Sequence, residues 1–189
     1  MSDTRPEVVL VRHGETEWSR DGRHTSDTDL PLTERGADVA RSLAPRLEHE
    51  SFALVLSSPL QRATTTAELA GFPDPEHEDD LREWSYGDYE GITTEEIRES
   101  VPGWSLWTHP TPGGESATEV TERLDRVVAR LESVEGDVLV FAHGHSLRAL
   151  TARWLGLEVS EGRLFHLDTA TVSVLGHERD NRAVVCWNS

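Results

Sequence analysis

Two histidines and two arginines follow apolar runs of this sequence, at positions where a strand would give way to a turn. Arg12 and His13 follow VVLV, Arg62 lies four residues after FALVLSS, and His143 follows VLVFA. Two guanidiniums can hold phosphate oxygens in fork geometry, and a neutral imidazole, with an ordinary pKa of roughly 6.5, is a good nucleophile toward phosphorus. A glycine follows each histidine, which lets the backbone approach a ligand closely. Together these residue types predict phosphoryl-transfer chemistry.

The elements that must position these residues alternate between strands and helices. Strand-like apolar runs lie at 8–11, 52–58, 137–144 and about 165–187. Apolar residues recur at a spacing of three to four over 33–50 and over 115–132, which predicts two helices. This alternation predicts an α/β fold with a largely parallel sheet. Because ligands gather outside the carboxyl ends of the strands in such sheets, we expect both histidines and both arginines to meet at one edge.

The pattern breaks up between Gly71 and Gly114, where prolines, glycines, acidic residues and tryptophans dominate. A chain of 189 residues fits one domain. We therefore expect a single domain over 1–189, with an embedded excursion or lid over the top of the sheet at about 71–114, and no linker between domains.

The composition excludes several classes of protein. The chain has 35 acidic and 18 basic residues, a formal net charge of −17, and no lysine, so all of its basic residues are arginines. The lack of lysine excludes a P-loop lysine, a Schiff-base lysine and a lysine general base, and the acidic balance argues against binding nucleic acid. No apolar stretch approaches the roughly 20 residues that span a bilayer, and the N-terminus does not have the layout of a secretory signal. The only cysteine, Cys186, cannot form an internal disulfide, so we expect a cytoplasmic protein that binds no membrane.

Six motifs, taken in order, resemble the histidine phosphatase superfamily, which has the phosphoglycerate mutase-like fold. The motifs are VRHGETEW at 11–18, DLPLTERG at 29–36, SSPLQRATTTAEL at 57–69, LREWSYGDYEG at 81–91, PGGES at 112–116 and VFAHGHSLRAL at 140–150. The resemblance covers nearly the whole chain. It implies a three-layer α/β/α fold with a mostly parallel central sheet and a C-terminal antiparallel edge.

The resemblance also implies a role for each residue that matches the family's site. His13 would be the nucleophile that forms a phosphohistidine, and Arg12, Arg62 and His143 would bind the transferring phosphoryl group. Glu83 would donate a proton to the leaving group and then accept one from the attacking water. Covalent catalysis divides one displacement into two. Arginines and a second imidazole are a sufficient electrostatic clamp without metal, so we expect no cofactor and no metal.

Further residues are expected to contact the substrate, a small phosphate ester. They are Arg12, Arg62, Arg23, Thr25, Ser26, Trp84, Tyr86 and Gly144. For Trp104 and Trp107 in the excursion, packing is the preferred interpretation. His145 forms an HxH pair with His143, but no third ligand stands at a recognisable spacing, so a metal site is not predicted.

The interval between Glu83 and His143 separates two activities of the family. In the mutases, as the resemblance presents them, a long basic insertion there cages the substrate; here the interval is short, and Arg98 is the only arginine between Glu83 and PGGES. We therefore predict a metal-independent phosphomonoester hydrolase. The segments EWSYGDYEGITTEEIRES and PGGES most resemble bacterial broad-specificity acid and sugar-phosphate phosphatases, which implies sugar phosphates or phosphoglycerate-like esters as substrates. Two alternatives stay open: a cofactor-dependent phosphoglycerate mutase and a catalytically inactive module that binds phosphate esters. The sequence leaves both a monomer and a homodimer open.

Overall fold

The computed structural model describes residues 5–47 and 51–189, and within them six strands form one mixed sheet. The strands are β1 (Val8–Arg12), β2 (Leu54–Ser57), β3 (Glu76–His77), β4 (Val138–Ala142), β5 (Val172–Glu178) and β6 (Asn181–Cys186). Their order is β3-β2-β4-β1-β5-β6, with β1 parallel to β4 and antiparallel to β5. The strands from β3 to β1 are parallel neighbours, whereas β5 and β6 form an antiparallel hairpin at the edge. This confirms the predicted mostly parallel sheet and its antiparallel C-terminal edge.

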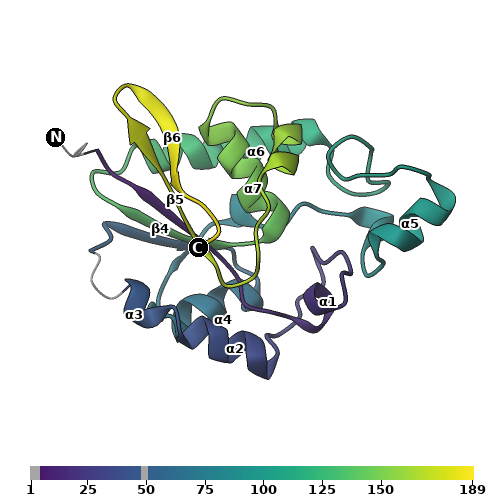
Figure 1. Cartoon of the computed structure of the whole chain (residues 1–189), viewed down its shortest axis with the longest axis horizontal. Coiled ribbons are helices and arrows are strands. Elements are labelled where there is room, and N and C mark those ends of the chain that lie inside the picture. The colour runs from purple at the N-terminus through teal and green to yellow at the C-terminus, as the bar shows by residue number, and fades with distance from the viewer. Residues whose placement is uncertain (1–4, 48–50) are drawn as a thin grey trace.

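Helices cover both faces of the sheet. They are α1 (Glu17–Arg20), α2 (Glu34–Arg41), α3 (Ala44–Leu47), α4 (Gln61–Leu69), α5 (Thr94–Ser100), α6 (Ala117–Glu132) and α7 (Gly144–Trp154), with 3₁₀ turns η1 (Asp79–Leu81), η2 (Gly87–Tyr89) and η3 (Val159–Leu164). Figure 1 shows α2, α3 and α4 on one side of the sheet and α6 and α7 on the other, which confirms the three layers. Across the described ranges, no helix has both the length and the apolar character needed to cross a membrane.

Side chains that alternate along β1 form the two cores. Val8 and Leu10 belong to the hydrophobic cluster that includes residues of α6 and α7, whereas Val9 and Val11 pack with Leu43 and other residues of the α2–α4 side. All four β1 side chains are buried, and each such burial stabilises the fold by about 1.5–3 kcal/mol. A strand that is apolar on both faces is typical of the centre of an α/β sheet.

The helix predicted over 33–50 is interrupted. In the described part of this range, α2 ends at Arg41 and α3 begins at Ala44; residues 48–50 lie outside the description. Pro45 has no N–H to donate to the carbonyl of Arg41, and its ring would clash with that carbonyl in a continuous helix. Within the first turn of α3 the same proline is tolerated, so the chain begins a new helix there. The helix predicted over 115–132 is confirmed as α6.

The neighbouring strands β1 and β4 lead to helices on opposite faces. After β1 the chain continues toward α2 on one side, and after β4 it enters α7 on the other (Figure 1). Such a switch point opens a crevice at the carboxyl ends of the two strands. His13 and His143 are the first residues after these strands, and the His13 N–H donates to the carbonyl of Ala142 over 3.0 Å. The topology therefore places both histidines at the crevice.

The segment over 71–114 contains β3, η1, η2 and α5. Its two-residue strand β3 pairs with β2 at the sheet edge and was not predicted, because two residues cannot show a periodicity. Further along, the segment contacts the loop that follows α1. The Gly91 N–H donates to the carbonyl of His24 over 2.8 Å, and the backbones of Arg23 and Thr93 form an isolated antiparallel β-bridge. These contacts hold part of the excursion beside the crevice.

Candidate active site

A cavity of about 260 Å³ opens beside the carboxyl ends of β1 and β4. It is lined by Arg12, His13, Thr16, Ser19, Gly22, Arg23, His24, Thr25, Glu83, Tyr86, Thr94, Gly144, His145, Arg148 and Leu167. Most of the residues expected from the sequence to contact substrate are among them. Ser26 and Trp84 are not brought to the cavity wall, and Arg62 and His143 lie behind it.

His13 is held in one tautomer by its own loop. The ring is 5% exposed, and its Nδ1 lies 2.7 Å from the carbonyl oxygen of Gly14. Because a carbonyl only accepts, Nδ1 must carry the proton, and Nε2 keeps its lone pair. Burial, followed by the charges of Arg62 and Arg12, lowers the pKa of His13 well below 6.5. The imidazole is therefore neutral, with a free nitrogen, at neutral pH.

Two glycines let the loop after His13 pack against the start of α2. A Cβ on Gly14 would lie 2.6 Å from the Gly36 carbonyl oxygen, and a Cβ on Gly36 would lie 2.2 Å from the Glu15 carbonyl oxygen. The Gly14 N–H also donates to Thr66 Oγ1 over 3.0 Å, and that hydroxyl donates to the carbonyl of Arg62 over 2.6 Å. Three motifs that are distant in sequence thus meet at this loop and fix the His13 backbone.

Arg62 and His143 form a hydrogen-bonded pair behind the cavity. Arg62 Nε donates to His143 Nδ1 over 3.1 Å, so the His143 proton lies on Nε2, which donates to Ser58 Oγ over 2.7 Å. The rings of His143 and His13 are 5.1 Å apart between centroids, in an edge-on arrangement. Burial, then the Arg62 charge, lowers the pKa of His143 well below 6.5. The structure thus brings together the two histidines and the arginine that the strand ends predicted.

The loop over 25–28 closes around the Arg62 guanidinium. Arg62 is fully buried and donates to the carbonyls of Thr25, Ser26 and Thr28. Glu90 accepts hydrogen bonds from the Ser26 and Thr28 N–H groups and from the Ser26 hydroxyl. Ser26 therefore lies outside the cavity lining, because its hydroxyl is directed to Glu90. Thr25 remains at the wall.

Arg12 presents an unsatisfied donor at the cavity. Its Nη1 donates to the carbonyl of Leu167, but its Nε is buried and has no hydrogen-bond partner within the described part of the chain. Gly144 makes room for it, since a Cβ at that position would lie 3.2 Å from the Arg12 Cζ. Over the described ranges no carboxylate lies within 4.0 Å of the Arg12, Arg23, Arg62 or Arg148 guanidiniums. Of these four, Arg62 is buried, Arg12 and Arg148 are half-buried and Arg23 is exposed. Cations without counter-ions around one cavity are what an anion site requires.

Glu83 is anchored at the N-terminus of α7. The carboxylate is 7% exposed; its Oε1 accepts from the N–H groups of Ser146 over 2.7 Å and Trp84 over 3.0 Å, and its Oε2 accepts from the His145 N–H over 3.0 Å. Such a helix end favours negative charge. Oε2 has a single donor, so it retains the capacity to face a ligand in the cavity.

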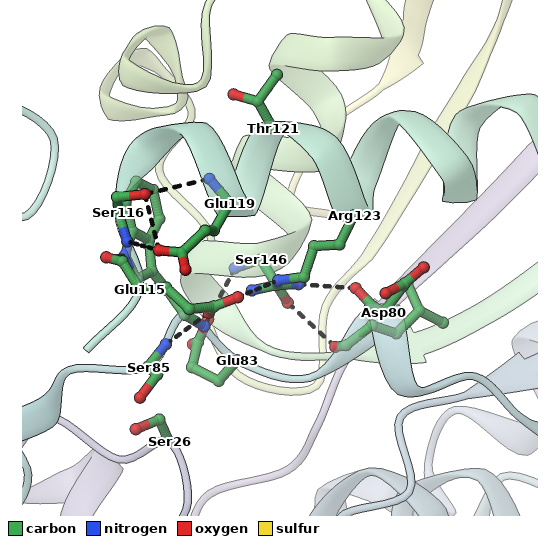
Figure 2. Close-up of polar contacts among 12 residues, drawn as sticks. Ser26, Asp80, Glu83, Ser85, Glu115, Ser116, Glu119, Thr121, Arg123 and Ser146 are labelled. Carbon is green, nitrogen blue, oxygen red and sulfur yellow. Dashed lines mark hydrogen bonds and ion pairs between the residues drawn. The ribbon is translucent and has the colours of Figure 1, made fainter. Parts of the chain in front are cut away.

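A buried ion pair braces the segment that carries Glu83, as Figure 2 shows. Arg123 on α6 donates to both oxygens of Glu115, over 2.7 and 3.0 Å, and to the carbonyl of Asp80 over 2.7 Å. Glu115 in turn accepts from the Ser85 N–H over 2.9 Å. Both sides of Glu83 are therefore tied to one guanidinium. Sequence reasoning missed this pair, although a charged residue next to the apolar stripe of a helix was a signal that could have found it.

Tyr86 and His145 line the cavity, whereas the tryptophans near them lie outside its lining. The Tyr86 hydroxyl lies 2.6 Å from His145 Nδ1, and burial raises the pKa of Tyr86 and lowers that of His145, so both are neutral. Trp84 is buried, and its indole N–H donates to the carbonyl of Glu115 over 3.0 Å, which explains its absence from the cavity lining. Trp104 is buried in the core, and the ring centroid of Trp107 lies 4.7 Å from the Arg148 Cζ. Within the described residues, no group of three or more histidine, cysteine or acidic side chains is arranged to hold a metal.

The chain is similar over most of its length to phosphatases and to a solved bacterial structure. The model of the histidine phosphatase superfamily (branch 1) matches residues 8–189. An acid phosphatase from Mycobacterium tuberculosis is 44% identical over 180 residues, which cover 93% of this chain and 88% of the relative. Sedoheptulose 1,7-bisphosphatase from Saccharomyces cerevisiae is 36% identical in an alignment that covers 85% of this chain and 72% of the relative. The solved structure of open reading frame Rv3214 from Mycobacterium tuberculosis matches with a TM-score of 0.93 and 41% identity over 97% of both chains.

Proposed function

The chain belongs to the histidine phosphatase superfamily, as its motifs predicted, and from this premise we propose that it is a metal-independent phosphomonoester hydrolase that acts through a phosphohistidine. The observation that carries the proposal is the state of His13: a buried, neutral imidazole whose Nδ1 is occupied by the Gly14 carbonyl and whose Nε2 is free. Within the described residues, no carboxylate lies within 4.0 Å of the Arg12 guanidinium beside it, and its buried Nε has no hydrogen-bond partner. A neutral nucleophile in a cationic pocket suits attack on a phosphate dianion.

In the first step, His13 Nε2 attacks phosphorus, and the bond between phosphorus and the ester oxygen breaks. The phosphoryl group moves to His13 while Arg12 holds its oxygens and offsets the charge that develops on them. Arg62 and His143, which lie behind the cavity wall, take part in this binding only if their hydrogen bonds to the 25–28 loop and to Ser58 rearrange. Glu83 must carry a proton at this point, against the preference of the helix end for a carboxylate, and gives that proton to the leaving alkoxide. The alcohol then departs, and Glu83 is left as a carboxylate.

In the second step, the same groups work in reverse order. Glu83 takes a proton from a water molecule, whose oxygen attacks the phosphorus of the phosphohistidine. The bond between phosphorus and Nε2 breaks, orthophosphate leaves, and His13 returns to its neutral form. Protonated Glu83 is ready for another ester. The net reaction consumes one water and converts the ester to an alcohol and phosphate.

Small phosphorylated metabolites are the proposed substrates. A cavity of about 260 Å³ suits a compact ester rather than a polymer, and the negative net charge of the protein disfavours polyanions such as nucleic acid. The relatives named above as an acid phosphatase and a sugar bisphosphatase support this class.

Phosphate release in EDTA tests the proposal. Wild-type protein, His13→Ala and the control His77→Ala, which changes an exposed histidine on β3, are assayed with p-nitrophenyl phosphate, 3-phosphoglycerate and fructose 1,6-bisphosphate. We expect release by wild type and the control, and loss of both turnover and the acid-labile phosphoenzyme in His13→Ala. A phosphoenzyme that survives in His13→Ala would contradict the nucleophile. No release from any ester by folded wild type would reject hydrolysis, and an assay with 2,3-bisphosphoglycerate would then test the mutase.

A further inference from the structure

Arg148 is a cavity-lining cation that the proposed hydrolysis leaves unused. It lies on α7 one helical turn after Gly144, the residue against which the Arg12 guanidinium packs. Residues four apart lie on the same face of a helix, and both line the one cavity. Arg148 therefore extends the positively charged wall along α7, away from the position of the reacting phosphoryl group.

The contacts of Arg148 hold its guanidinium plane but leave part of it free. Nε donates to the carbonyl of Gly162 over 3.1 Å, Nη2 donates to the carbonyl of Arg163 over 3.4 Å, and one face rests on the Trp107 ring at 4.7 Å. Within the described residues no hydrogen bond uses Nη1. Carbonyls and an aromatic face orient a guanidinium without neutralising it. Burial lowers its pKa, and the nearby Glu83 charge opposes this effect.

The absence of a carboxylate partner distinguishes Arg148 from its neighbour on the same helix. Arg153 pairs with both oxygens of Asp125, over 2.7 and 3.1 Å, whereas no carboxylate in the described part of the chain lies within 4.0 Å of Arg148. Arg148 shares this lack of a carboxylate partner with Arg12 and Arg23, which line the same cavity, in a chain with nearly twice as many acidic as basic residues. A planar guanidinium edge of this kind binds carboxylate or phosphate oxygens.

We propose that Arg148 forms a second anion subsite, which selects phosphate esters that carry a further phosphate or carboxylate on the same molecule. The inference rests on the proposed function, because it assumes that the reacting phosphoryl group occupies the His13 end of the cavity. The Nη1 group then binds the second anionic group at the Arg148 end of the cavity. The subsite accounts for a cavity whose cationic lining extends beyond what one phosphoryl group requires.

Paired substrates and a matched control test the subsite. Arg148→Gln removes the charge but keeps an amide that can donate to the Gly162 carbonyl, and Arg153→Gln makes the same change at an arginine outside the cavity. We expect Arg148→Gln to lower the ratio of kcat/KM for fructose 1,6-bisphosphate to that for p-nitrophenyl phosphate by about 10- to 100-fold, the range of one charge-assisted hydrogen bond. The loss should fall mainly on KM. Arg153→Gln should leave the ratio unchanged. With 3-phosphoglycerate, a parallel fall indicates that a carboxylate also binds, and an unaltered ratio restricts the subsite to phosphate.

Binding to a variant that cannot turn over separates the subsite from the hydrolysis. In a His13→Ala background, titration calorimetry compares orthophosphate with fructose 1,6-bisphosphate. Adding Arg148→Gln should weaken the bisphosphate about 10- to 100-fold and orthophosphate far less, whether or not the wild type hydrolyses either ester. Equal weakening of the two ligands, or equal kinetic losses on all substrates, would show that Arg148 only supports Trp107 and would overturn the subsite. If Arg148→Gln does not fold, Arg148→Lys, which keeps the charge and loses the fork, should still lower the ratio, and an unchanged ratio would count against the proposal.

Discussion

The carboxylate of Glu83 accepts a hydrogen bond of 2.7 Å from the main-chain N–H of Ser146, in the first turn of the helix that follows His143. One rigid helix end therefore sets the position of both the proposed proton donor and the second histidine. Because the donors are backbone groups, no side-chain movement is needed to align them. The backbone at the start of α7 therefore fixes the position of Glu83 relative to His143 and the proposed phosphoryl site.

Glu83→Gln should separate substrates by their leaving groups. An alkoxide needs a proton to depart, whereas p-nitrophenolate does not, and a positioned general acid contributes about 10²- to 10⁴-fold. We expect kcat on 3-phosphoglycerate to fall by about 100-fold or more and kcat on p-nitrophenyl phosphate to fall much less. Steady-state kinetics on both esters, with exposed Glu34→Gln as the control, measure the difference. Equal losses on the two esters would argue against an acid role.

Arg123→Gln should reduce the stability of the fold and also the contribution of Glu83 to hydrolysis. The change leaves Glu115, whose side chain is 25% exposed, without its partner. We therefore expect a loss below the roughly 3–5 kcal/mol that breaking a fully buried pair costs. The control is Arg126→Gln, whose guanidinium is 62% exposed and pairs with Asp80; a surface pair of this kind contributes about 0–1 kcal/mol. Urea unfolding measures both changes. If Arg123 also positions Glu83, its variant should lose more activity on alkyl esters than on p-nitrophenyl phosphate, and an equal loss on the two would reduce Arg123 to a structural role.

Acid should destabilise the fold through its buried histidines. Burial lowers the pKa of His24 to about 4, although the charge of Glu90 partly opposes this shift. In the unfolded chain the same imidazole takes up its proton near pH 6.5. The stabilising contribution is complete above pH 6.5 and is lost as the pH falls toward 4, by up to about 3 kcal/mol. His13, His143 and His145 act in the same direction.

His24→Gln should therefore flatten the dependence of unfolding free energy on pH. Urea titrations at pH 7, 5.5 and 4.5 compare this variant with wild type and with exposed His77→Gln. The expected result is a smaller loss between pH 7 and 4.5 in His24→Gln alone. Identical pH profiles for all three proteins would mean that His24 does not contribute.

The strand ends and motifs predicted the fold and the centre of the site because they are local signals. An apolar run followed by a histidine and a glycine marks the carboxyl end of a central strand, and parallel strands bring such ends together. The positions of His13, His143 and Arg62 follow from this rule. The roles assigned to these side chains remain predictions that the experiments above test.

Features that depend on tertiary packing were not predictable in the same way. The position of Arg123 beside the apolar stripe of α6 signals a buried charge, but not that its partner is Glu115 in the loop before the helix. The hydrogen bond from Trp84 to the Glu115 carbonyl also joins residues that lie far apart in the sequence. His24 gives no local signal, since its burial comes from Tyr86 and Trp104, which lie far along the chain. The break before α3, by contrast, was readable from Pro45.

The pairing of β1 with strands from the end of the fold has a consequence for synthesis. Arg12 donates to the carbonyl of Leu167, and the Ala170 N–H donates to the carbonyls of Arg12 and His13. On the ribosome β1 emerges first, but its neighbours β4 and β5 follow only after more than a hundred further residues. A nascent chain therefore holds an unpaired, apolar β1 until β4 and β5 have been synthesised, and such an exposed strand is prone to aggregate or to bind chaperones. The site takes shape only when the last strands fold onto the first.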